Sequence, residues 1–191
     1  MQNIILLTNH SDKAAAIGQS LTDLGETVYK LDLNQLHTFS LGLQVADVCI
    51  AVEDKIDDAL LIKIGQLVEQ LQVPVMMFTE DNQAEHIVAA THAGASAYIA
   101  GDIDMARLPS LIAAAKARFT FTKQLVEQLD DTKNKLNERK TIERAKGLLM
   151  KQRQLDEDAA YALMREMAMK KNVKIVDLSK QLLNTVDMLT V

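Results

Sequence analysis

The chain has 191 residues, of which 48% are apolar and 25% are charged, so its composition is that of a globular protein and not of a disordered one. It contains no run of about 18 apolar residues that could span a membrane, and its first residues lack the basic segment of a signal peptide. We therefore expect a cytoplasmic protein without a membrane partner. The single cysteine, Cys49, excludes an internal disulfide framework and a multi-cysteine metal site.

The formal net charge of −5 is distributed unevenly along the chain. Residues 1–119 carry 7 basic and 15 acidic side chains, which leaves −8, whereas residues 120–191 carry 14 basic and 11 acidic ones, which leaves +3. Within residues 135–174 the balance is 11 basic against 6 acidic side chains. This asymmetry indicates a basic interaction module attached to an acidic domain.

Short apolar runs alternate with amphipathic stretches in the acidic part. We expect strands that are apolar on both faces, as in a sheet between two helix layers, at 4–8, 27–31, 48–52, 75–78 and 97–100. Helices are expected at 12–24, 57–71 and 82–93, the first ended by Gly25 and the last by Gly94, while 34–43 follows neither pattern clearly. This order predicts an α/β flavodoxin-like, doubly wound parallel sheet.

A long helix is expected to begin near Asp104 and to continue for about 45 residues, because no stop signal interrupts it. Within it, a 4-3-4 spacing typical of a coiled-coil seam is followed by Leu125, Leu129, Thr132 and Leu136. The seam indicates a homodimer formed through this connector. The alternative is an amphipathic helix that packs on its own domain.

The rest of the chain predicts a bundle of three short helices, none of which would be stable alone. The long helix ends with Ile142, Ala145, Leu149 and Gln152. Asp156 is a candidate N-cap for a second helix, whose apolar stripe is Ala160, Leu163, Met164 and Met167. A third helix carries Ile175, Leu178, Leu182, Val186 and Leu189.

Residues 1–118 resemble a response-regulator receiver domain, in strand order and spacing and in the segments 74–79 and 94–98. The resemblance implies metal-assisted phosphoryl transfer to an aspartate after the third strand. That chemistry needs an acidic pair after the first strand, a hydroxyl after the fourth and a lysine after the fifth, since carboxylates hold Mg²⁺ and cations offset the phosphoryl charge.

This chain departs from the receiver pattern at most of those positions. Asn9 and His10 replace the acidic pair, Val52 occupies the nucleophile position, and Gly101 stands where the lysine is expected, while Thr79 and Tyr98 match. We therefore expect a pseudo-receiver with no phosphoacceptor, metal or cofactor. The alternative is a register slip that makes Glu53 or Asp54 the acceptor; the interpretation we favour is that these two, with Asp57 and Asp58, form a solvated loop and helix N-terminus.

Residues 137–191 resemble the ANTAR domain, an RNA-binding antitermination module. The resemblance is carried by residues 143–150 and 156–165 and by the closing apolar helix. It implies an RNA-binding surface, for which the candidates are the clustered cations and one aromatic side chain: Lys140, Arg144, Lys146, Lys151, Arg153, Arg165, Lys170 and Tyr161.

Two residues of this module have competing interpretations. Gly147 lies in mid-helix, where glycine is unfavourable, so either close packing within the bundle or close approach of RNA would explain it. Tyr161 could stack on an unpaired base, although a tyrosine beside an apolar stripe more often packs in the core.

The plan of pseudo-receiver (1–118), coiled-coil connector (119–136) and ANTAR domain (137–191) is similar to that of NasT-type regulators of nitrate and nitrite assimilation, and AmiR-type regulators share it. The resemblance implies an antiterminator that binds paired hairpins in a leader mRNA. It also implies control through sequestration by a ligand-sensing protein of the NasS or AmiC type.

Three other functions remain open on the residues alone. They are an RNA-binding regulator switched by phosphorylation, an adaptor that binds only protein, and an enzyme. The enzyme is the least supported, because His10, His37, His86 and His92 lack metal-ligand spacing, Cys49 lies in an expected strand and no glycine-rich phosphate loop is present.

Overall fold

The computed structural model describes residues 1–9, 12–32 and 46–189, with side chains to Thr185. The expected features at 34–43, His10, His37 and the side chains of Val186 and Leu189 lie outside the described residues. The chain divides into two compact units, Met1–Lys123 and Gln124–Val191, each described by itself below.

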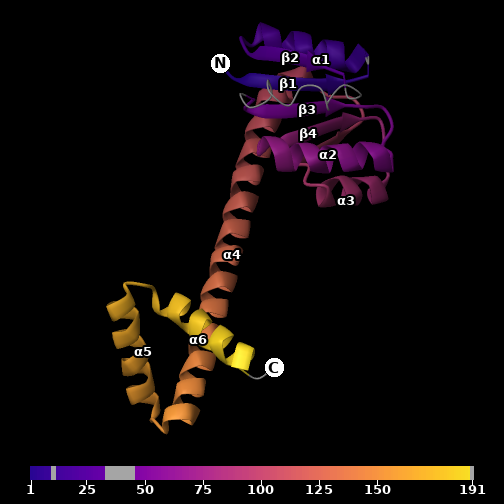
Figure 1. Cartoon of the computed structure of the whole chain (residues 1–191). Helices are drawn as coiled ribbons and strands as arrows, with labels where there is room; N and C mark the ends of the chain where they lie inside the picture. The colour runs from indigo at the N-terminus through magenta and orange to yellow at the C-terminus, as the bar shows by residue number, and fades with distance from the viewer. Residues whose placement is uncertain (10–11, 33–45, 190–191) are drawn as a thin grey trace. The chain divides into compact units, whose positions relative to one another are not determined.

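The first unit contains a five-stranded parallel sheet with the order β2-β1-β3-β4-β5 (Figure 1). Its strands are β1 (Asn3–Thr8), β2 (Thr27–Leu31), β3 (Val48–Val52), β4 (Val75–Thr79) and β5 (Ala97–Ala100). This order is that of the flavodoxin-like fold, so the predicted fold class is confirmed and all five expected strands are present within a residue of their predicted bounds.

Helices cover both faces of the sheet. On one face, α1 (Asp12–Asp23) and the first turns of α4 (Leu108–Arg153) bury Ile17, Leu21 and Ile112 against β1, β3 and β4. On the other face, α2 (Asp58–Leu71) and α3 (Ala84–His92) form a second core around Ile64 and Met77. The helix ends predicted at Gly25 and Gly94 are confirmed, with φ of 81° and 96°.

The expectation of strands buried on both faces is right for β3 and β4, whose residues are all buried, and wrong for β2 and β5. Tyr29 in β2 is 48% exposed. The physical reason is position, since β2 and β5 are the edges of the sheet and their residues are only partly covered. Cys49 is fully buried in β3, as expected, and burial raises the pKa of its thiol to about 12.

The long helix is confirmed as α4, 46 residues preceded by a 3-10 turn, η3 (Met105–Arg107), which Asp104 caps by accepting from the Ala106 N–H at 3.0 Å. Residues 120–140 are exposed throughout. Leu125, Leu129 and Leu136 are each about half exposed, at 49%, 53% and 52%. The described residues of this chain therefore do not pack over the apolar side chains of the predicted seam.

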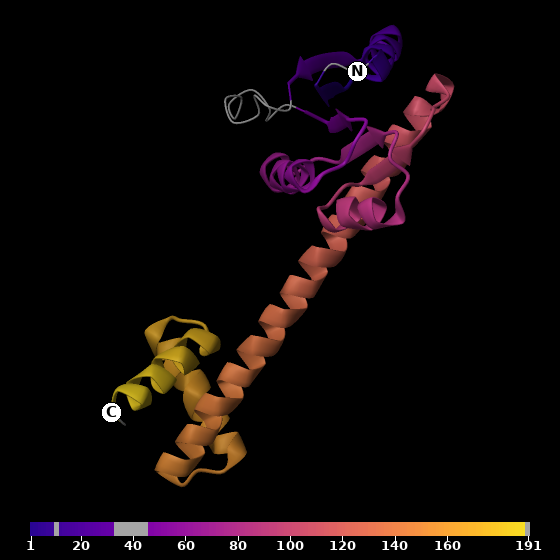
Figure 2. The same ribbon diagram turned by 90° about the vertical axis from the view of Figure 1, so that its right-hand side faces the viewer.

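The second unit packs α5 (Glu157–Lys171) and α6 (Ile175–Leu189) against the end of α4 (Figure 2). The core consists of Ala145, Leu149, Ala160, Met164, Ala168 and Leu178, of which all but Ala168 are on the faces that the sequence predicts to be apolar. Asp156 caps α5 as predicted, because its carboxylate accepts from the Ala159 N–H at 2.8 Å. Gln154 and Asn172, both with φ of 52°, end α4 and α5.

Candidate functional site

Val52 closes the end of β3 at the carboxyl edge of the sheet, where receivers carry their nucleophile. It pairs in register with Thr8 of β1 and Phe78 of β4 and is 1% exposed. An apolar side chain at this depth offers no oxygen for phosphoryl transfer, so any acceptor would have to come from the loop that follows.

Glu53 is the first residue of that loop and is held by a neighbouring strand end. Its Oε1 accepts the backbone N–H of Asn9 at 3.0 Å. Partial burial raises the pKa of its carboxyl, an effect that outweighs the lowering by the hydrogen bond from Asn9. Asp54 is exposed, and its backbone carbonyl accepts from the Thr79 hydroxyl at 3.2 Å.

The hydroxyls of Thr79 and Tyr98, the two residues that match the receiver pattern, are both engaged by backbone groups. Thr79 Oγ1 accepts from the Asp81 N–H at 3.0 Å, and the Tyr98 hydroxyl donates to the Asp81 carbonyl at 2.9 Å. The Asp81 carboxylate accepts from the Gln83 N–H at 2.9 Å, which lowers its pKa, and contacts His86 Nδ1 at 2.6 Å. At the carboxyl edge of the sheet, these side chains therefore already bind one another or nearby backbone groups.

A cation does lie at this edge, but it comes from α1. Lys13 Nζ donates to the Gly101 carbonyl at 2.6 Å and forms an ion pair with Glu80. No sequence pattern indicates this contact, since the expected lysine position is Gly101 itself. Gly101 has a φ of 78°, a backbone conformation that a lysine would adopt only with strain. In the part of the chain that the structure describes, no cluster of His, Cys, Asp or Glu could hold a metal ion.

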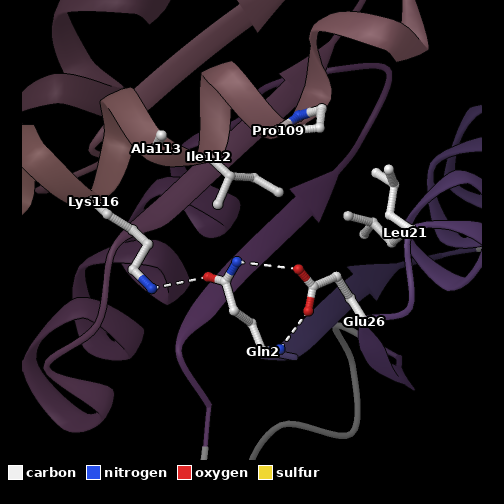
Figure 3. A pocket seen from close by; sticks show the side chains of 8 residues that line it. Gln2, Leu21, Glu26, Pro109, Ile112, Ala113 and Lys116 are labelled. Carbon is white, nitrogen blue, oxygen red and sulfur yellow. Dashed lines mark hydrogen bonds between the residues drawn. The ribbon is translucent and has the colours of Figure 1, made fainter.

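A cleft of about 480 Å³ opens between α1 and the first turns of α4 (Figure 3). Its walls are mainly apolar, and its three polar side chains bind one another: Lys116 Nζ donates to Gln2 Oε1 at 2.9 Å, and Gln2 Nε2 donates to Glu26 Oε1 at 3.2 Å. Because these groups already satisfy each other, the cleft leaves no unpaired polar group to recognise a ligand.

The cations of the second unit fall into two groups. Lys140, Arg144 and Lys151 lie on one face of α4, which also contains Gly147, because their spacing of four, three and four residues returns to the same side of a helix. We call these four residues the outer face of α4. All are exposed, whereas Ala145 and Leu149 point into the bundle core. The three cations have no acidic partner among the described residues, so their charge is available to a ligand.

Lys146 is different, because its ammonium is held inside the module. Its Nζ lies 2.6 Å from Glu143 Oε2 and 2.7 Å from Glu157 Oε1, and its side chain is only 9% exposed. The hydrogen bonds that its ammonium donates to Glu143 and Glu157 raise its pKa. In this geometry Lys146 joins two helices, and its charge is compensated by carboxylates of the protein itself.

The other candidates lie mainly on α5. Arg153, at the end of α4, and Arg165 are exposed and have no ion pair with a described residue, whereas Lys170 pairs with Glu166 at 2.6 Å. Tyr161, for which the sequence left partial burial and base stacking open, is 47% exposed and is not among the residues packed against the bundle core. Its spacing of four places it on the face of Arg165.

Comparison with known proteins finds relatives for both parts of the chain. The ANTAR domain family matches residues 130–183. The transcriptional regulatory protein PdtaR of Mycobacterium tuberculosis is 26% identical over 163 residues, which cover 85% of this chain and 76% of that protein. The nitrate regulatory protein of Klebsiella oxytoca is 43% identical over 60 residues, 31% of this chain but only 15% of that protein.

For the first unit, the similarity is one of fold. The chemotaxis protein CheY4 of Vibrio cholerae superposes with a TM-score of 0.52 at 15% identity, covering 60% of this chain and 98% of that one. In the described residues, no helix is long and apolar enough to cross a membrane.

Proposed function

We propose that this chain, which joins an ANTAR domain to a receiver-like domain, is a transcription antiterminator that binds paired hairpins in a leader mRNA. The observation that carries the proposal is the outer face of α4, where three unpaired cations line one side of a helix in a chain of net charge −5. Cations in such a row neutralise successive phosphates, and counterion release then supplies affinity.

The exposed side chains also fit recognition of a hairpin loop. A-form RNA has a deep, narrow major groove that side chains cannot read, so sequence is read mainly at unpaired bases. Tyr161 is half exposed beside Arg165 and is available to stack on such a base. We propose that the cations of α4 position the RNA and that the α5 face contributes to reading its loop.

We propose that the receiver-like domain acts through protein contact, so that a ligand-sensing protein of the NasS or AmiC type sequesters the chain in the cytoplasm. Val52 at the nucleophile position and the engagement of Thr79, Tyr98 and Lys13 support control that does not depend on phosphorylation. The functional division into 1–118, 119–136 and 137–191 is part of the same proposal.

The exposed seam of α4 supports a homodimer. Leu125, Leu129 and Leu136 are large apolar side chains at coiled-coil spacing, and a second copy would remove them from water. Two ANTAR domains in one dimer could bind two hairpins, and tethering would then raise the affinity for the pair. We propose a nitrate or nitrite assimilation operon as the target, on the similarity to the Klebsiella oxytoca nitrate regulatory protein.

The test is RNA binding followed by antitermination. Full-length protein is titrated against a labelled leader RNA with two hairpins before a terminator, taken from an assimilatory operon of the source genome, at several salt concentrations. We expect salt-dependent binding and increased read-through in transcription with purified polymerase. Binding that is absent at low salt, or read-through unchanged by the protein, would refute the function.

A further inference from the structure

Gly147 lies in the interior of α4, and the described residues give no structural reason for a glycine there. Glycine destabilises a helix interior relative to alanine, because it loses more backbone freedom on folding. A Cβ atom built at Gly147 would meet nothing within 4 Å. Close packing within the bundle, one of the two explanations that the sequence allowed, is therefore excluded for the described residues.

At other positions of this chain, a crowded neighbour or a positive φ explains why glycine is present. A Cβ at Gly18 would lie 3.0 Å from the Lys30 side chain, and one at Gly94 would lie 3.0 Å from Val68. Gly101 and Gly25 have positive φ. Gly147 has neither a crowded neighbour among the described residues nor a left-handed backbone, so nothing in the described part of the chain requires a glycine at this exposed position.

The surroundings of Gly147 indicate the chemistry of the outside molecule. Arg144 lies three residues before it and Lys151 four residues after it, on the same exposed face. The nearest acidic side chain in that turn, Glu143, is engaged with Lys146 at 2.6 Å. Because Gly147 has no side chain, a ligand can come close to the helix backbone there. The exposed cations on either side, Arg144 and Lys151, favour a polyanion as that ligand.

We propose that Gly147 is the point where the RNA sugar–phosphate backbone comes closest to the protein, with Arg144 and Lys151 binding phosphates on either side. The inference rests on the proposed RNA-binding function and goes further, because it assigns a contact to a residue without a side chain. A Cβ at this position would hold the RNA backbone away from the helix while leaving the protein's own packing unchanged.

The experiment compares two glycine-to-alanine variants. Gly147→Ala should raise the thermal stability of the protein, since alanine favours the helix, and should weaken RNA binding by about tenfold, the loss expected for one charge-assisted contact. The matched control is Gly65→Ala in α2, where the new Cβ would make an ordinary contact of 3.7 Å with Ala93 O. The control should also raise stability but leave RNA binding unchanged.

The probe is a fluorescent pool of two-hairpin RNAs with randomised loops, titrated against full-length protein by anisotropy. Gly147→Ala should lower affinity without changing the salt slope, because no charge is lost, whereas Arg144→Ala should reduce that slope by about one. If the unaltered protein binds neither this pool nor the natural two-hairpin leader RNA, the proposed function fails. If it binds and Gly147→Ala binds equally well, or if Gly147→Ala lowers thermal stability, this inference is overturned.

Discussion

Lys146 Nζ lies 2.7 Å from Glu157 Oε1, so one ion pair joins the last turns of α4 to the first turn of α5. Glu143 completes the contact from within α4 at 2.6 Å. The ANTAR-like segment 143–150 therefore contains a lysine whose main partners are inside the protein. This contact holds the end of α4 and the start of α5 together. A substitution of Lys146 is therefore expected to affect protein stability first and RNA binding only indirectly.

Lys146→Met should lower the thermal stability of the second unit and should weaken RNA binding only through that loss. Removing the ammonium leaves Glu143 and Glu157 facing each other without compensation, which is unfavourable for two like charges. Circular dichroism melts measure the effect, and Glu157→Gln should reproduce part of it. Unchanged melting in both variants would contradict a structural role.

The same ion pair predicts a specific loss of stability at high pH. The pKa of Lys146 is raised above its ordinary value of 10.5, mainly by the hydrogen bonds that its ammonium donates to Glu143 and Glu157. The stabilisation is therefore fully present below about 10.5 and is lost as the pH rises through the folded-state pKa. The difference in the free energy of unfolding between the unaltered protein and Lys146→Met should therefore decrease as the pH rises above about 10.5. A difference that does not change with pH would contradict a stabilising ion pair.

The outer face of α4 predicts how single cations contribute to RNA binding. Lys140→Ala, Arg144→Ala and Lys151→Ala should each weaken binding and reduce the salt slope by about one, since each removes one phosphate contact. Lys55→Ala, an exposed lysine of the acidic domain, makes the same charge change elsewhere and should have little effect. Equal effects of Lys55→Ala and Arg144→Ala would indicate a nonspecific charge effect and not a surface.

The carboxyl edge of the sheet predicts that a phosphodonor has no effect. After incubation with Mg²⁺ and a small phosphodonor, intact-mass spectrometry should show an unmodified protein, because Val52 cannot accept a phosphoryl group. A mass increase of one phosphoryl group on Glu53 or Asp54 would instead support the phosphorylation-switched alternative. A receiver domain with a complete site serves as the positive control.

The exposed seam predicts a dimer that a single charge disrupts. Leu129→Lys should shift the protein towards monomer in sedimentation velocity, because a buried ammonium without a partner is unfavourable in a coiled coil. Gln128→Lys places the same charge one residue away from the seam and should leave the dimer intact. If the unaltered protein is a monomer, the proposed dimer is excluded. If the dimer persists in Leu129→Lys, its interface lies outside the seam.

The local features of this protein could be predicted because they depend on residues close together in the chain. The strands follow from runs such as 48–52, the cap of α5 from Asp156, and the division into an acidic and a basic part from counting charges. Helical spacing alone places Lys140, Arg144 and Lys151 on one face of a helix.

What only the tertiary structure decided is which of these residues face another part of the protein. Lys13 contacts Gly101 across 88 positions of sequence, Lys146 contacts Glu157 across a turn, and a Cβ atom at Gly147 would meet no described residue within 4 Å. Sequence periodicity states which side chains share a face, but what packs against that face depends on elements brought together by folding. For that reason the sequence by itself determined that this protein has a basic surface. The tertiary structure decided which cations of that surface are exposed and which are paired with carboxylates of the protein.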